Sequence, residues 1–459
     1  MVIAMPQHAA VLLDILEQDG FSAYLVGGCV RDAILGRQPH DWDICTSALP
    51  AQMQASFAAH GLRTLDTGLR HGTLTVLMEE GSLEVTTYRV EGAYSDTRHP
   101  DAVHFVDRIE LDLARRDFTV NAIAYHPRRG LVDPYGAAPL LESGQAVICA
   151  VGDPTARFRE DALRILRALR FAAVLGLSIE PHTAQALGTP ALLERLAHIS
   201  AERIRDELCA LLVGEYVEAV LTGYPGVIGQ ILPEMLPTVG FEQRNPHHAY
   251  DVWTHTAKAI ASAPPLLAVR LALVFHDLGK PSTFTADKDG VGHFYGHMRV
   301  SEVLARQAML RLRFPNALIE RVALLVRRHD DGIPCTPAAI RRRLCRYGEE
   351  ALRQLLLVKR ADNAAKSSGA RDGRLQELAC LTTELEAVLR EEPVTGRGSL
   401  AVNGKDLLQL GVRGPAIGDM LRYLLEAVID DPRCNSKGAL LSIARRRMTK
   451  RKGNKQENT

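Results

Sequence analysis

LVGGCVRDAILGRQPHDWDICT, residues 25–46, is the stretch that best indicates the fold class of this chain. An apolar run ends at Gly27 and Gly28 and leads into a helical pattern, an arrangement in which glycine lets backbone N–H groups approach an anion. Asp41 and Asp43 follow at a spacing of two, which in a strand places both carboxylates on one face. Since neighbouring carboxylates repel each other unless a cation joins them, the stretch predicts a divalent-metal site.

Short apolar runs with strand character surround this stretch between residues 21 and 135. They read FSAYLVGG, TLTVLM, LEVTTYRV, VHFV and NAIAY, with two helical patterns among them. Glu84 stands in the third run and would supply a third carboxylate from a neighbouring strand. The mixture predicts an α+β domain, and from about residue 153 onwards the pattern becomes almost wholly helical, with Ser200 placed to cap one helix.

The composition of the 459-residue chain is that of a multidomain globular protein. With 46% hydrophobic and 24% charged residues, it has no apolar run near the roughly 20 residues that span a bilayer. Its first residues show no signal-peptide pattern. The eight cysteines include no CxxC pair, which argues against a zinc ribbon and a disulfide scaffold. We therefore expect a cytoplasmic protein of roughly two to four domains.

The formal net charge is only +1, so a nucleic-acid partner would have to bind local basic patches. Two such patches lie at residues 341–343 and 445–455. The second patch fits a solvated chain terminus equally well, and the sequence leaves both interpretations open.

Three motifs occur in a fixed order along the first half of the chain. GG…RD…DWD ends at Asp43, RRDFTVNA spans residues 115–122, and EDALRILRALRF spans residues 160–171. This series resembles class II CCA-adding tRNA nucleotidyltransferases and the related bacterial poly(A) polymerases. The resemblance implies a polymerase β-like nucleotidyltransferase head, followed by all-α domains, that uses Mg²⁺, CTP and ATP to extend tRNA.

The resemblance also implies roles for individual residues. Asp41 and Asp43, with Glu84 beside them, would hold two Mg²⁺ ions that activate an RNA 3′-hydroxyl and hold the leaving pyrophosphate. The residues expected to bind the incoming nucleotide are Gly28, Arg31, Arg115, Arg116, Asp117, Asn121, Asp161, Arg164, Arg167 and Arg170.

Asp161 and Arg164 belong to the EDxxR motif, which forms a protein template in the family. Three residues apart on one helix, they would share a face. An aspartate accepts from the exocyclic amine of cytosine or adenine while an arginine donates to the neighbouring ring nitrogen. Uracil and guanine present the reverse order, which costs about 1–3 kcal/mol per unpaired group. The alternative is a salt bridge on a helix surface.

Two segments distinguish the branches of this family. RVEGAYSDTRHPDAVHFV, residues 89–106, carries Gly92, Ser95, Asp96 and Pro100 in an uninterrupted polar loop that CC-adding members lack. TGLRHGTLTV, residues 67–76, is more similar to CCA-adding enzymes than to poly(A) polymerases. The expected activity is therefore addition of C, C and A. The alternatives are a poly(A) or A-adding polymerase, or a phosphohydrolase that acts on RNA 3′ ends.

Histidines and aspartates recur in the segments NPHHAYDVWTHT, LALVFHDLGKP, GHFYGHMRVS, RRHDDG and KRADNAAKS. The set resembles the HD superfamily of metal-dependent phosphohydrolases. Its implied metal ligands are His255, His276, Asp277, His297, His329 and Asp362. Such ligands favour Ni²⁺, Mn²⁺, Co²⁺ or Fe over Mg²⁺, and Lys280 would face the scissile phosphate. The alternatives are packed core histidines, or a scaffold that keeps its ligands and bridges head and tail on tRNA.

Pro/Gly-rich interruptions near residues 225–240 and 392–399 suggest domain boundaries. We expect a nucleotidyltransferase head (1–145), a helical neck with the base-recognition motif (146–225), an HD metal-binding domain (226–390) and a C-terminal tRNA-binding tail (391–459). The tail resembles that of HD-containing CCA enzymes. Its loop at Asn403, Gly404 and Lys405 would contact tRNA backbone or simply form a turn between helices.

Overall fold

The computed structural model describes residues 2–39, 41–92, 103–391 and 396–456. The chain forms two compact units, Met1–Leu236 and Pro237–Thr459. Most of the polar loop expected at Gly92–Pro100 lies outside the described residues. No helix among the described residues is long and apolar enough to cross a membrane.

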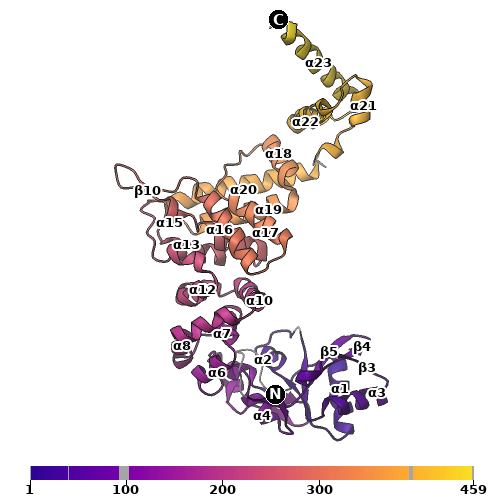
Figure 1. Cartoon of the computed structure of the whole chain (residues 1–459), viewed down its shortest axis with the longest axis vertical. Helices are drawn as coiled ribbons and strands as arrows, with labels where there is room; N and C mark the ends of the chain where they lie inside the picture. The colour runs from indigo at the N-terminus through magenta and orange to yellow at the C-terminus, as the bar shows by residue number, and fades with distance from the viewer. Residues whose placement is uncertain (1, 40, 93–102, 392–395, 457–459) are drawn as a thin grey trace. The chain divides into compact units, whose positions relative to one another are not determined.

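A seven-stranded mixed sheet forms the core of the first unit, with strand order β3-β4-β5-β2-β1-β8-β9. Figure 1 labels β3, β4 and β5 of this sheet. Its strands are β1 (Ala23–Val26), β2 (Asp43–Thr46), β3 (Arg63–Gly68), β4 (Thr73–Met78), β5 (Gly81–Thr87), β8 (Ala124–His126) and β9 (Gly130–Val132). Strands β2 and β5 pair in parallel, and the other pairs are antiparallel. A separate ribbon pairs β6 (Arg89–Glu91) with β7 (Val103–Phe105). The predicted strands are confirmed, whereas β3 and β9 were not anticipated.

The helices of the head are α1 (Gln7–Gln18), α2 (Gly28–Ile34), α3 (Pro50–Ala59), α4 (Ile109–Ala114) and α5 (Ala137–Glu142), with the 3-10 turns η1 (Leu69–His71) and η2 (Thr119–Asn121). Gly27 precedes α2 at φ 79°, a left-handed conformation that favours glycine. A Cβ at Gly27 would also lie 2.8 Å from a guanidinium nitrogen of Arg116. Gly27 therefore lets the chain turn into α2 in close contact with Arg116.

The neck consists of α6 (Pro154–Glu160), α7 (Leu163–Leu175), α8 (Pro181–Leu187), α9 (Pro190–Leu193), η3 (Glu194–His198), α10 (Ala201–Leu212), α11 (Val217–Gly223) and α12 (Pro225–Ile231). Long helices α7 and α10 pack against each other. Ser200 occupies the N-cap position of α10, although its side chain makes no capping hydrogen bond.

The prediction of one continuous helix through Asp161 and Arg164 is wrong. Helix α6 ends at Glu160, and Asp161 adopts an extended backbone with φ −140° and ψ 106°. Its Oδ1 accepts the N–H of Leu163 at 3.0 Å. A short acceptor side chain satisfies an otherwise free N–H at the start of a helix, so Asp161 favours a break there.

The second unit is helical. It contains η4 (Pro233–Thr238), which straddles the boundary, then α13 (Val252–Ser262), α14 (Leu267–Phe275), α15 (Lys280–Thr283), α16 (His297–Arg311), α17 (Asn316–Arg328), α18 (Pro337–Tyr347), α19 (Glu349–Ala364) and α20 (Ser368–Arg390). A small hairpin of β10 (Thr285–Ala286) and β11 (Gly292–His293) lies between α15 and α16. Every residue from Val269 to Phe275 in α14 is buried, because α14 packs against α13, α16, α17 and α19.

The chain ends in η5 (Arg397–Ser399), α21 (Gly404–Gln409), α22 (Pro415–Asp430), η6 (Pro432–Cys434) and α23 (Lys437–Gln456). Asn403 caps α21, since its Oδ1 accepts the N–H groups of Lys405 and Asp406 at 2.9 and 3.3 Å. Arg341 of α18 donates to the carbonyl oxygen of Ile429 at 3.2 Å, and Arg342 pairs with Glu426 at 2.9 Å. Two arginines of the first basic patch thus join α18 to α22.

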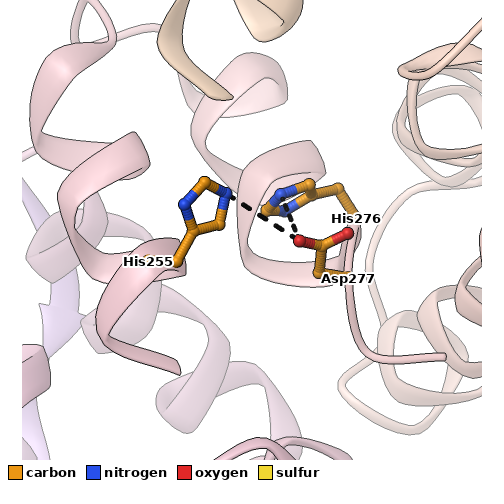
Figure 2. Close-up of side chains that lie close together, drawn as sticks. All are labelled: His255, His276 and Asp277. Carbon is orange, nitrogen blue, oxygen red and sulfur yellow. Dashed lines mark ion pairs between the residues drawn. The ribbon is translucent and has the colours of Figure 1, made fainter. Parts of the chain in front are cut away.

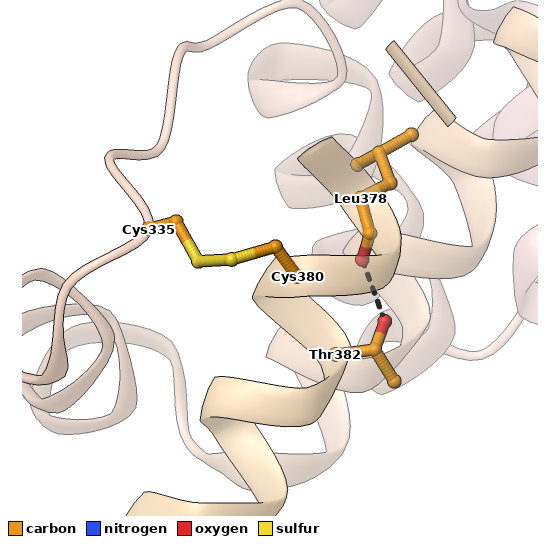
Figure 3. The surroundings of a disulfide bond; sticks show 4 residues. All are labelled: Cys335, Leu378, Cys380 and Thr382. Carbon is orange, nitrogen blue, oxygen red and sulfur yellow. Dashed lines mark hydrogen bonds between the residues drawn. A yellow bond between two sulfur atoms is a disulfide. The ribbon is translucent and has the colours of Figure 1, made fainter. Parts of the chain in front are cut away.

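One disulfide joins Cys335, in the segment between α17 and α18, to Cys380 of α20 (Figure 3). The other six cysteines are free. The bond is a single cross-link between packed elements and was not expected, because the sequence analysis predicted a cytoplasmic protein without a disulfide scaffold.

Candidate functional site

Three exposed carboxylates gather at one place on the head sheet. Asp43 opens β2 and is the Cα partner of Glu84 on the parallel strand β5. Asp41 lies two residues before Asp43. The pKa of Asp43 is raised because surrounding protein atoms exclude water from its carboxyl group and because Glu84 and Asp41 repel its charge, while Arg116 acts in the opposite direction. This donor set fits a divalent cation, which would relieve the repulsion.

Asp117 organises the polar residues beside these carboxylates. Its Oδ1 accepts the N–H of Phe118 at 2.8 Å and the amide of Asn121 at 3.1 Å, and its Oδ2 pairs with Arg167 at 2.7 Å. Arg31 donates to the Asn121 carbonyl oxygen at 2.6 Å. Burial alone would raise the pKa of Asp117, but Arg167 and these hydrogen bonds lower it to about 2.

Arginines from α2 and α7 converge on the ring of Phe171. The guanidinium of Arg170 lies 4.1 Å from the ring centroid, that of Arg31 5.2 Å and that of Arg167 5.3 Å. Arg170 also pairs with Glu207 of α10 at 2.6 Å. The structure therefore brings together three predicted nucleotide-binding arginines, which come from two separate motifs.

Arg115 and Arg116 are both held by Asp112, which is fully buried. Asp112 Oδ1 lies 2.8 Å from Arg115, and its Oδ2 lies 3.2 Å from Arg116. Burial alone would raise the pKa of Asp112, but the two arginines lower it. The sequence analysis missed this residue, although an acid three and four positions before two arginines on a helix is a recognisable signal.

Asp161 and Arg164 have separate carboxylate and guanidinium partners. The Oδ2 of Asp161 pairs with Arg203 of α10 at 2.7 Å, and Arg164 pairs with Glu160 at 2.5 Å. The guanidinium of Arg164 also donates to the backbone carbonyl of Arg115 at 3.4 Å. Because Asp161 lies outside the helix, the prediction that it shares a helix face with Arg164 is corrected. Arg203 is a further residue that the sequence did not indicate.

The second cluster consists of the histidines and aspartates predicted in the helical unit. Two groups of three have ligand atoms within 4.8 Å of one another: His255, His276 and Asp277, and Asp277, His297 and His329. Asp277 is common to both groups. Figure 2 shows His255 and His276 directed toward its carboxylate from α13 and from the end of α14.

Asp277 and Asp362 each lie close to histidines of the cluster. Asp277 Oδ2 lies 3.1 Å from His276 Nε2, and Asp277 Oδ1 lies 3.4 Å from His297 Nε2. Asp362 Oδ1 lies 2.9 Å from His255 Nε2. His329 Nε2 lies 3.3 Å from His297 Nε2. All six predicted ligands are thus brought together from five segments of the chain.

The Nδ1 atom of each histidine faces a backbone carbonyl oxygen. His276 contacts Leu273, His297 contacts Phe294 and His329 contacts Val326, at 2.7, 2.9 and 2.7 Å, and His255 contacts Ala365 at 3.4 Å. A carbonyl can only accept, so Nδ1 carries a proton, and a metal would bind these rings through Nε2. His276 Nε2 is buried and makes no hydrogen bond, which also fits a metal ligand.

The pKa values of two histidines in the cluster are shifted in opposite directions. Burial alone would lower the pKa of His276, but Asp277 and Asp362 raise it to about 9. Burial and the neighbouring His276 lower the pKa of His329 to about 3, so that ring is neutral. Lys280 pairs with Asp277 at 2.6 Å, and Lys366, which the sequence analysis did not single out, pairs with Asp362 at 2.8 Å.

A cavity of about 300 Å³ opens beside the cluster. Asp277, His297, His329 and Asp362 line it, together with Lys280, Lys366, Asn245, His248, His293 and Tyr295. The predicted alternative of unrelated core histidines is therefore not favoured, because the rings meet at a shared carboxylate next to open space.

The three carboxylates of the head and the histidine cluster each lie in a region that matches a known family model. The family model of the poly A polymerase head domain matches residues 23–146, the probable RNA and SrmB-binding site of polymerase A matches 176–223, and the HD domain matches 247–366. A crystal structure of the Bacillus stearothermophilus CCA-adding enzyme in complex with CTP is similar, with a TM-score of 0.71 and 29% identity, covering 98% of this chain and 100% of that chain.

Curated relatives match over nearly the whole chain. The CCA-adding enzyme of Lactiplantibacillus plantarum is 34% identical over 447 residues, covering 96% of each protein. That of Geobacillus stearothermophilus is 33% identical over 429 residues, covering 92% of this chain and 93% of the relative. The matches span nearly the whole chain, so this chain belongs to the family of CCA-adding enzymes, and its residues 247–366 match an HD domain.

Proposed function

We propose that this enzyme adds C, C and A to the 3′ end of tRNA, using CTP and ATP and no nucleic-acid template. The observation that carries the proposal is the register of Asp43 with Glu84, which places these two carboxylates side by side on the sheet of the head, with Asp41 two residues before Asp43. A curated CCA-adding enzyme that matches this chain over 96% of its own length supports the choice of product. Solved relatives in complex with CTP and with tRNA support the choice of substrates.

Asp41, Asp43 and Glu84 would hold two Mg²⁺ ions. Bound there, the ions supply the Lewis acidity that activates the RNA 3′-hydroxyl and compensates the charge of the departing pyrophosphate. The residues of the chain provide the geometry. Because Asp43 begins a buried strand that is paired on both sides, its carboxylate is held in place while remaining open to substrate.

The incoming triphosphate would bind along the arginines that meet near Phe171 and Asp117. Arg31, Arg167 and Arg170 supply positive charge. Asn121 orients Arg31, and Asp117 orients Arg167. Both would accept hydrogen bonds from the ribose hydroxyls. Gly28 opens α2, where a backbone N–H can approach a phosphate. Arg115 and Arg116, held by the buried Asp112, would add further positive charge.

Asp161 and Arg164 would read the base edge. In this arrangement Arg203 positions Asp161, and Glu160 positions Arg164, so each side chain has its own support. Asp161 accepts from the exocyclic amine and Arg164 donates to the ring nitrogen, a pattern that cytosine and adenine share.

Poly(A) addition is the weaker candidate, because the relatives that span the whole chain are CCA-adding enzymes. Hydrolysis as the only activity is also not favoured, because the head carries its own carboxylate site.

The HD domain would provide a second, phosphohydrolase activity. His255, His276, Asp277 and Asp362 suit one transition metal, and His297 with His329 a second, with Ni²⁺, Mn²⁺, Co²⁺ or Fe as the suited ions. Bound there, such ions supply Lewis-acid activation of water. Lys280 and Lys366 provide positive charge next to the cavity. A scaffold that only bridges head and tail on tRNA is the alternative.

We further propose that the chain works in the cytoplasm, where tRNA is matured, and that residues 391–459 form a tRNA-binding tail. Residues 1–145, 146–225 and 226–390 would act as head, neck and HD domain. Arg445 to Arg447 remain candidates for phosphate contacts, whereas Asn403 is engaged in capping α21.

The direct test is incubation of the protein with labelled CTP or ATP and a tRNA that lacks its last three nucleotides. We expect products extended by CC with CTP alone and by CCA with both nucleotides, identified by sequencing the 3′ ends. Long A tracts would indicate the poly(A) alternative, and absence of any extension would contradict the proposal.

A further inference from the structure

Two aromatic rings stand at the cavity beside the histidine cluster. His293 and Tyr295 are stacked, with ring centroids 5.6 Å apart and ring planes 9° from parallel. Both line the same cavity of about 300 Å³ as Asp277 and His297. Tyr295 is 77% exposed. So large an exposure of an aromatic ring, next to a polar centre, leaves a flat π-face available for a ligand.

The position of this pair is fixed relative to the cluster. Nε2 of His293 lies 3.0 Å from a carboxylate oxygen of Asp287, whose other oxygen accepts the N–H groups of Asp289 and Val291. The segment is tied at its other end, where His297 Nδ1 contacts the carbonyl of Phe294. The rings are therefore attached to the hairpin on one side and to a predicted metal ligand on the other.

We propose that Tyr295 and His293 form a stacking platform for a nucleobase, and that they select nucleoside phosphates as the substrates of the HD site. This inference rests on the proposed phosphohydrolase activity and specifies its substrate class. The phosphate would lie at Asp277 and its histidines, close to Lys280 and Lys366, and the base would stack on Tyr295.

The chemistry of the platform suits an RNA end. Every base has a π-face, so stacking on an aromatic ring is tolerant of sequence. The cavity is large enough for a ligand of the size of a nucleotide. A tyrosine that only filled space would be buried against the core, whereas Tyr295 packs its ring on His293 and leaves most of its surface open.

The test uses the full-length protein loaded with Mn²⁺ or Ni²⁺ and measures equilibrium binding of adenosine 3′-monophosphate and of inorganic phosphate by calorimetry. Tyr295→Ala is expected to weaken binding of the nucleotide about 10-fold, the scale of one lost base stack, and to leave binding of inorganic phosphate unchanged. Tyr295→Phe should bind like the original protein. Tyr250→Ala, which removes an exposed tyrosine of the same unit that does not line the cavity, should have no effect.

Hydrolysis measured in parallel separates this inference from the function on which it rests. Tyr295-dependent nucleotide binding without hydrolysis of adenosine 2′,3′-cyclic phosphate would contradict the phosphohydrolase and support the platform. Hydrolysis in which Tyr295→Ala raises KM for the cyclic nucleotide, but not for β-glycerophosphate, would support both. Equal binding of adenosine 3′-monophosphate by the original protein and Tyr295→Ala would overturn the platform, whatever the hydrolysis assay shows.

Discussion

Asp43 on β2 and Glu84 on β5 are Cα partners across two parallel strands. In such a pair the two side chains lie on the same face of the sheet, and a shift of the register by one residue would move Glu84 to the opposite face. The flanking pairs Ile44–Val85 and Cys45–Thr86 hold this register. Ile44 and Val85 are fully buried, so the apolar core fixes where the carboxylates meet.

Asp43→Asn should reduce incorporation of both CTP and ATP by at least about 100-fold, because removal of one carboxylate weakens a shared metal site that stabilises charge in the transition state. Binding of tRNA, measured by filter binding, should change little. Asp66→Asn, which alters an exposed aspartate on β3, is the matched control. Near-normal CTP incorporation by Asp43→Asn would refute the assigned role.

Arg164→Ala should admit UTP or GTP during extension, since the guanidinium is the proposed donor to the base edge. The relative rates for the four nucleotides, measured with one tRNA substrate, give the result. If Arg164 only supports the fold through Glu160, the variant will lose thermal stability and overall rate while keeping its preference for CTP and ATP. Arg205→Ala, which removes a partly exposed arginine of α10, serves as the comparison.

Asp277→Asn should remove metal binding at the HD cluster, because Asp277 belongs to both groups of three potential ligands. Bound Ni²⁺ or Mn²⁺, counted by elemental analysis after dialysis, should fall, and hydrolysis of 2′,3′-cyclic AMP should be lost. CCA addition should remain within about twofold, since the head has its own site. Asp289→Asn on the exposed hairpin should retain both metal and hydrolysis. Full metal content in Asp277→Asn would disprove the ligand role.

Reduction of the Cys335–Cys380 disulfide should lower the Tm by several degrees. The bond closes a loop with a sequence separation of 45, for which the chain-entropy estimate is about 4 kcal/mol at most. Calorimetry with and without dithiothreitol measures the change. The Tm of Cys335→Ser should be insensitive to the reductant, and Cys434→Ser, which changes a free cysteine, should respond like the original protein. An unchanged Tm on reduction would show that the bond adds no stability.

Much of the architecture followed from local patterns. Short apolar runs bounded by turn residues predicted β1, β4, β5 and β8, because such runs are typical of strands that pack into a core. Strand β3 was missed, since the run RTLDTG at Arg63–Gly68 is largely polar and takes its strand conformation from pairing with β4. The break at Asp161 was missed because a capping hydrogen bond competes with helix continuation, and spacing alone does not reveal which wins.

By itself, the sequence determined which residue types could carry the chemistry. The order of Asp41, Asp43 and Glu84, and of His255, His276 and Asp277, is a property of the chain, and it sufficed to predict metal sites. Only the tertiary structure decided the partners of these groups. Asp161 pairs with Arg203 from 42 residues away, and Asp277 meets His329 from another helix. Such contacts arise because buried apolar faces bring distant helices together. The free energy that selects one packing is the sum of many small contacts across the whole core, so no single motif predicts it.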